Sequence, residues 1–148
     1  MNKHFILGVF SLCWNSFVFG VSLTNKSSKN ILIVDEYAFS RRVLVDTLKQ
    51  LKYENIEEVP DVYSGLVRLK SGLFDLVITK WETSKMNGLE FLMQIRFDPN
   101  LKEIPVLMVF EYEIQENIVA AFKAGLNAHV VKPVDLKSFA EKMEEIFK

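Results

Sequence analysis

From residue 31 to the C-terminus, short apolar runs alternate with longer stretches in which apolar residues recur at helical spacing. The runs have strand length and are rich in β-branched residues, which is typical of strands buried on both faces of a parallel sheet. They predict strands at Ile31–Val34, Ile56–Val59, Leu73–Thr79, Pro105–Phe110 and Ala128–Val131. The amphipathic stretches predict helices at Ala38–Lys52, Tyr63–Leu69, Leu89–Phe97, Ile114–Ala124 and Leu136–Phe147. This strict alternation predicts an α/β fold, an open doubly wound five-stranded parallel sheet with five helices covering both faces.

The first 23 residues do not follow this pattern and form a separate apolar segment. Between Phe5 and Leu23, thirteen of nineteen residues are apolar and none is charged. Three interpretations stay open for residues 1–23: a signal peptide, a membrane anchor, or a translation start assigned too far upstream. Residues 24–30 are polar and predict a linker, so that residues 31–148 form the domain. Any membrane contact would then involve only residues 5–23.

Composition limits the classes of protein to which the domain can belong. With 148 residues, 49% of them hydrophobic, the chain holds enough material for one ordinary core. The total charge is -1, of which residues 1–30 contribute +3 through three lysines, which leaves -4 for the domain. That balance is not the basic surface of a nucleic-acid-binding protein. The single cysteine, Cys13, precedes the domain, so we expect the domain in the cytoplasm, with an anchored or exported location left open by the N-terminal segment.

Charged side chains follow three of the predicted strands. Asp35 and Glu36 come after the first strand, Lys80 after the third and Lys132 after the fifth. Because functional groups in such sheets gather beyond the carboxyl ends of the strands, we expect these four side chains to share one edge. The sequence has neither a glycine-rich dinucleotide motif nor a phosphate-binding loop, and its two histidines do not suggest a nucleophilic triad. We therefore expect a protein that is not an enzyme.

Four motifs in chain order resemble the receiver domain of response regulators, and in particular single-domain chemotaxis receivers of the CheY type. They are Ile31–Glu36, Asp75–Glu90, Lys102–Val109 and Val130–Pro133. The resemblance implies a flavodoxin-like sheet with strand order 2-1-3-4-5 and a cis peptide between Lys132 and Pro133. It also implies partners among signalling proteins: a histidine kinase, a chemotaxis protein or another output protein.

At the centre of the resemblance, Lys80 stands where receivers have the aspartate that accepts a phosphoryl group. A lysine ammonium has no lone pair with which to attack phosphorus. In the family, three carboxylates, one lysine and one Mg²⁺ balance in charge, whereas here Asp35, Glu36, Lys80 and Lys132 balance without a metal ion. We hypothesise that the Lys80 ammonium takes the place of the cation and pairs with both acids. Asp35 and Glu36 remain the only candidate Mg²⁺ ligands, in competition with Lys80, and no other cofactor is expected.

The residues that couple a receiver's pocket to its output surface also differ. Phe110 stands where the family has Ser or Thr, Glu111 adds a negative charge beside it, and His129 replaces the usual Tyr or Phe. The resemblance places the output surface near a set of mostly apolar residues: Tyr112, Ile114, Val119, Phe122, His129 and Pro133.

These features predict an atypical receiver of a two-component, phosphorelay or chemotaxis-like pathway, one that is not phosphorylated at the usual position and acts by binding other proteins. Two alternatives remain. One is a receiver that uses another acceptor, for which the candidates are Asp75, Thr79, Glu82 and Thr83. The other is a membrane-tethered structural domain. A simpler interpretation of the pocket also stays open, in which the two acids are solvated and Lys80 extends into water.

Overall fold

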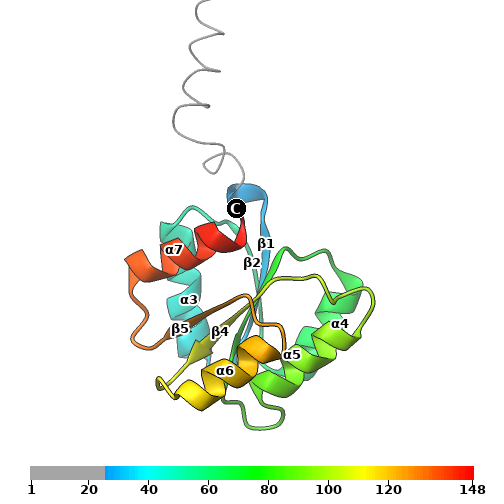
Figure 1. Cartoon of the computed structure of the whole chain (residues 1–148). Coiled ribbons are helices and arrows are strands. Elements are labelled where there is room, and N and C mark those ends of the chain that lie inside the picture. Colours follow the sequence, from blue (N-terminus) through cyan, green and yellow to red (C-terminus); the bar gives the residue numbers. More distant parts are fainter. Residues whose placement is uncertain (1–25) are drawn as a thin grey trace, which may run out of the picture.

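The structure is a computed structural model that describes residues 26–148 (Figure 1). The apolar segment at residues 1–23, with its three interpretations, lies outside the described residues. Within the described range, no helix combines the length and the apolar character needed to cross a membrane.

The strands are β1 (Asn30–Val34), β2 (Asn55–Val59), β3 (Leu76–Lys80), β4 (Val106–Phe110) and β5 (Ala128–Val131). The helices are the short 3-10 helix η1 (Lys26–Ser28), α3 (Ala38–Gln50), α4 (Val62–Ser71), α5 (Gly88–Phe97), α6 (Gln115–Lys123) and α7 (Leu136–Ile146).

The strands form one parallel sheet in the order β2-β1-β3-β4-β5, which confirms the predicted fold class and strand order. Successive residues of a strand point to opposite faces, and β1 shows this directly. Ile31 and Ile33 belong to the core under α3 and α7, whereas Leu32 and Val34 belong to the core under α4, α5 and α6. Figure 1 shows these two helical layers on either side of the sheet. The carboxyl ends of all five strands consequently meet at one edge.

The ends of some elements differ from the prediction. Residues 26–28 of the predicted linker form η1, and β1 starts one residue earlier than expected, at Asn30. The third strand starts at Leu76 instead of residue 73, because Leu73 is 90% exposed and belongs to the preceding loop. Asp75 also lies outside the strand, where its carboxylate accepts a hydrogen bond from the backbone N–H of Asn30 at 2.8 Å.

Side-chain caps and one arginine fix the connections between these elements. The carboxylates of Asp61 and Asp135 and the amide oxygen of Asn87 accept backbone N–H groups at the starts of α4, α7 and α5. Arg96 of α5 donates to the backbone oxygens of Lys102, Ile104 and Gly125 and to the side-chain oxygen of Asn127. Arg96 therefore ties α5 to the loop before β4 and to the loop before β5.

Candidate functional site

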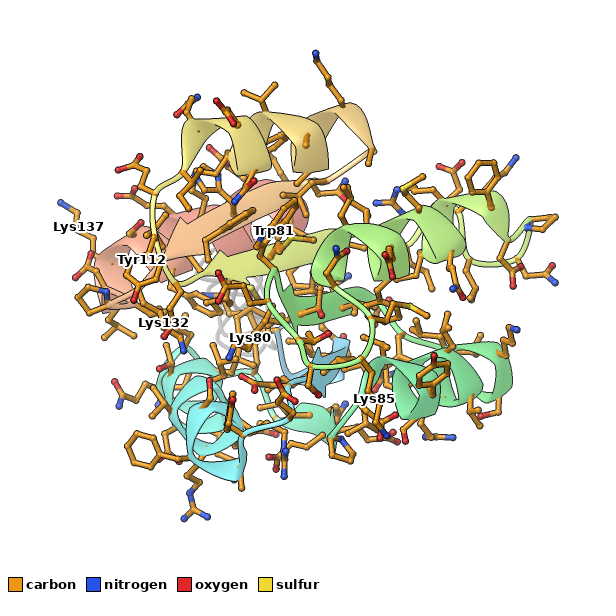
Figure 2. All side chains as sticks on the ribbon, turned by 90° about the horizontal axis from the view of Figure 1, so that it is seen from below. Lys80, Trp81, Lys85, Tyr112, Lys132 and Lys137 are labelled. Carbon is orange, nitrogen blue, oxygen red and sulfur yellow. The ribbon has the colours of Figure 1, made fainter. Side chains whose placement is uncertain are left out.

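Lys80 is the last residue of β3, and its backbone is paired with Val109 of β4. The side chain is almost completely buried, with 7% of the residue exposed. Figure 2 looks onto the carboxyl edge of the sheet and shows Lys80 near its centre, between Lys132 and Lys85. The backbone after Lys80 turns tightly, since a Cβ added to Gly88 would overlap the carbonyl oxygen of Lys80. The strand and this close approach of α5 together hold Lys80 at the centre of the edge.

Asp35 is the acid that contacts Lys80. The distance from Lys80 Nζ to Asp35 Oδ1 is 3.9 Å, and only 1% of Asp35 is exposed. The same Oδ1 accepts the backbone N–H of Tyr37 at 2.9 Å. The Tyr37 ring covers the ammonium, with 4.6 Å between Nζ and the ring centroid. Nothing in the sequence pattern had indicated Tyr37, because its contact depends on the course of the backbone after β1.

Glu36 does not take part in this contact. It is half-buried and lines a cavity of about 230 Å³ that Asp35 also lines, together with Asp61, Thr83 and Lys85. No ion pair joins it to Lys80, so the lysine contacts one acid and not both, and the hypothesis that it pairs with both is wrong on this point. The other carboxylate oxygen of Asp35, Oδ2, is buried without a hydrogen-bond donor.

These residues do not fit the Mg²⁺ that the resemblance implies. Within residues 26–148, no group of three or more histidine, cysteine or acidic side chains is arranged to hold a metal ion. Mg²⁺ takes oxygen ligands, usually with one or two carboxylates among them. Asp35 already faces an ammonium, whose charge would repel a divalent cation at the same oxygens.

The second lysine of the edge, Lys132, is also engaged within the chain. Its Nζ lies 3.0 Å from Glu111 Oε2, and both side chains are partly exposed. The peptide bond from Lys132 to Pro133 is cis, as the resemblance implied. Lys132 and Glu111 leave β5 and β4, which are neighbouring strands, so the pair closes the edge beside Lys80.

Aromatic rings from four elements connect this edge with the α6 side of the molecule. Trp81 stacks on Phe110 with 5.4 Å between ring centroids and 22° between planes. Phe110 meets the His129 ring edge to face at 6.0 Å, and His129 meets Phe122 of α6 in the same way at 5.5 Å. Burial, together with the positive charge of Lys142, lowers the pKa of His129. The ring of Phe110 therefore belongs to this row and to the core under α5 and α6.

The residues that the resemblance assigns to an output surface lie on α6, in the loop before it, in β5 and in the loop after β5. Tyr112, Ile114, Val119, Phe122 and Pro133 are exposed, whereas His129 is half-buried. Tyr112 and Lys132 are both labelled on the carboxyl edge in Figure 2. The row of rings from Trp81 to Phe122 connects these residues with the edge at which Lys80 lies.

The alternative phosphoacceptors are spread over different environments. Asp75 precedes β3, at the opposite edge of the sheet from Lys80. The hydroxyl of Thr79 is buried, and the Thr79 side chain points to the face opposite that of Lys80. Thr83 donates its hydroxyl hydrogen to the carbonyl oxygen of Met86, and Glu82 is exposed in the same loop. None of these side chains has the central position that Lys80 occupies.

Comparison with known proteins agrees with this geometry. The chain is 39% identical over 126 residues to the chemotaxis protein CheY-3 of Vibrio cholerae, covering 85% of this chain and 96% of that protein. It is 39% identical over 117 residues to the chemotaxis protein CheY of Pseudomonas aeruginosa, covering 79% and 94%.

Solved structures show the same fold. The bacteriophytochrome response regulator RtBRR superposes with a TM-score of 0.72 at 28% identity, over 80% of this chain and 77% of that one. The CheY4 protein of Vibrio cholerae superposes with a TM-score of 0.73 at 24% identity, over 80% and 98%. Residues 31–144 match the response regulator receiver domain. The chain therefore belongs to the response-regulator receiver family.

Proposed function

We propose that this protein is a receiver that is not phosphorylated at the usual position and that works by binding other proteins in a chemotaxis or two-component signalling pathway. The observation that carries the proposal is the buried Lys80 at the end of β3, with its ammonium 3.9 Å from Asp35. Phosphoryl transfer requires a nucleophile and a positioned divalent cation. Lys80 puts an ammonium where the nucleophile would be, and this ammonium faces Asp35, which would otherwise be a ligand of the divalent cation.

The charges around Lys80 support an inert pocket. Lys80 faces Asp35, and Lys132 is paired with Glu111 at 3.0 Å. Receivers use the lysine at this position to contact the phosphoryl group. Here that contact would first have to break the pair with Glu111, whose carboxylate would also repel the phosphoryl oxygens.

The proposed role is that of a binding module and not of an enzyme. The relatives from Vibrio cholerae and Pseudomonas aeruginosa are chemotaxis proteins, and the partners that we propose are signalling proteins such as a histidine kinase or a chemotaxis output protein. The exposed apolar side chains on and before α6 offer the contact surface. As part of the same proposal, the domain works in the cytoplasm.

Acetyl phosphate with Mg²⁺ tests the chemical part of the proposal. We expect intact-mass spectrometry to find no added phosphoryl group on the native chain, while the Lys80→Asp variant gains one. Phosphorylation of the native chain would overturn the proposal. Peptide mapping would then show whether Asp75, Thr79, Glu82 or Thr83 is the acceptor.

Two matched valine variants test the binding part. Val119 lies on α6 and Val67 on α4, and both side chains are exposed. Affinity capture with the full chain should recover signalling proteins, and Val119→Asp should lose them while Val67→Asp keeps them. Recovery of no signalling protein by the native chain, or equal loss in both variants, contradicts a binding role for the α6 surface.

A further inference from the structure

A row of four rings runs from the pocket to the output surface, and we call it the aromatic ladder: Trp81, Phe110, His129 and Phe122. Its first member directly follows Lys80, and its last member is a 42% exposed residue of α6. The tryptophan ring and the two phenylalanine rings are uncharged at every pH. Histidine is the side chain whose unperturbed pKa puts a charge change between about pH 5 and 8.

The environment of His129 suits the neutral ring. Its Nδ1 is buried and has no hydrogen-bond partner. Protonation places a hydrogen on both ring nitrogens and leaves a charged N–H group at Nδ1 without an acceptor. The rings on either side offer only a cation–π attraction, worth on the order of 0.5–2 kcal/mol. Burial and the positive charge of Lys142 lower the pKa of His129, so the neutral ring is favoured.

Charged groups near His129 come from two neighbouring elements. Lys142 of α7 opposes protonation, and Glu113 of the loop before α6 favours it. The facing strand β4 contains only apolar residues, and the charged residues of α6 are Glu116 and Lys123. Because Lys142 and Glu113 act in opposite directions on the pKa of His129, substituting either residue should shift that pKa without changing His129 itself.

The two ring neighbours of His129 differ in how readily they can move. Phe110 is 1% exposed and lies in the core, whereas Phe122 lies at the surface. A protonated His129 needs water at Nδ1 or a polar partner. Displacing Phe122 admits water at a smaller loss of packing than displacing Phe110, since a half-exposed ring gives up less buried area.

We infer that protonation of His129 switches the output surface, by releasing Phe122 from the aromatic ladder without any phosphoryl group in the pocket. This inference rests on the proposed function, because a receiver that is not phosphorylated needs another input if its output surface is to change. Mildly acidic conditions would then change the shape of α6 where partners bind. At neutral pH the ladder stays closed.

Nuclear magnetic resonance of the full chain tests this directly between pH 8 and pH 5. The chain has two histidines, so the His129 ring signal can be assigned by comparison with a His129→Phe variant. We expect His129 to titrate with a midpoint below 6.5, and the Phe122 ring and the α6 amides to shift with the same midpoint. In His129→Phe the α6 shifts should disappear.

Two further variants keep the test decisive if His129→Phe does not fold. Lys142→Met should raise the common midpoint, and Glu113→Gln should lower it, whereas a purely structural histidine would leave the α6 signals unchanged across the range. A His129 that titrates while Phe122 stays fixed, or that does not titrate above pH 5, overturns the inference. The measurement contains no acetyl phosphate, so its failure is separate from any phosphorylation of the chain.

Discussion

Replacing Lys80 by methionine should destabilise the fold, because it removes the ammonium that faces the buried Asp35 carboxylate. At the observed 3.9 Å, two unit charges attract by about 4 kcal/mol at an effective dielectric constant of about 20. Desolvation of both groups offsets much of this attraction, although the removal of one partner from a buried pair costs on the order of 3–5 kcal/mol. Because Asp35 keeps its hydrogen bond from the backbone of Tyr37, we expect Lys80→Met to cost about 2–3 kcal/mol.

A double-mutant cycle isolates the pair itself. Urea unfolding at pH 7, followed by circular dichroism, should be measured for Lys80→Met, Asp35→Asn and the double variant. We expect the double variant to lose about 1–3 kcal/mol less than the two single losses together. Lys85→Met is the matched control at an exposed position of the same edge and should stay within about 0.5 kcal/mol of the native chain. Additive single losses would refute the reasoning, since the two groups would then not interact.

Four other measurements check separate parts of the structure. Arg96→Ala should cost about 2–3 kcal/mol in urea unfolding, because it removes five hydrogen bonds to four acceptor groups of two loops, of which Asn127 Oδ1 keeps the backbone N–H of Val106. Arg42→Ala on the exposed face of α3 should cost less than about 0.5 kcal/mol. Gly88→Ala should cost about 1–3 kcal/mol, since the added methyl group overlaps the backbone of Lys80, and a native unfolding midpoint would show that the close approach is absent. Isothermal titration with Mg²⁺ should give no receiver-like binding to the native chain, and a measurable heat of specific binding would show that a metal site survives. Between about pH 7 and 9 stability should be constant, and it should fall below pH 6.5, because His129 is protonated more readily in the unfolded chain than in the fold. The carboxyl groups with lowered pKa values act at lower pH, since their ordinary values are 4.5 and 3.8, and the raised pKa of Tyr53 acts only above pH 10. The same decline below pH 6.5 in His129→Phe would contradict this assignment.

Hydrophobic periodicity predicted the order of strands and helices, because the central strands β1, β3 and β4 are buried on both faces and each helix on one, although β2 is mostly exposed. It was less accurate at strand ends. Leu73 and Phe74 extend the apolar run before β3 in sequence, yet Leu73 is exposed and the strand begins at Leu76. Lys80 was placed just after the strand, since a charged residue normally ends an apolar run, but the structure includes it as the last residue of β3. Periodicity reports burial, and it cannot recognise a charge that is buried beside its partner.

The gathering of charged residues at one edge also followed from the sequence, whereas their individual partners did not. Lys80 contacts Asp35 and the ring of Tyr37, and Lys132 takes Glu111. These choices depend on side-chain directions and on the loops after β1 and β4, which no spacing rule describes. The aromatic ladder was invisible for the same reason, since its rings come from four different elements.

The departures from the receiver pattern support one another in charge and in space. With a lysine at position 80 and no other change, the ammonium groups of Lys80 and Lys132 would lie at the same edge. Their repulsion would favour a conformation in which one of the two side chains turns out of the pocket. Glu111 reduces this repulsion because its carboxylate pairs with Lys132 at 3.0 Å, while Asp35 pairs with Lys80. Phe110 then occupies the end of β4 with a ring that stacks on Trp81, where the family uses a hydroxyl to contact the phosphoryl group. Both lysines of the edge are therefore held by ion pairs within the chain, and under the proposed function any control of the output surface enters by a residue other than the one at the usual phosphoacceptor position.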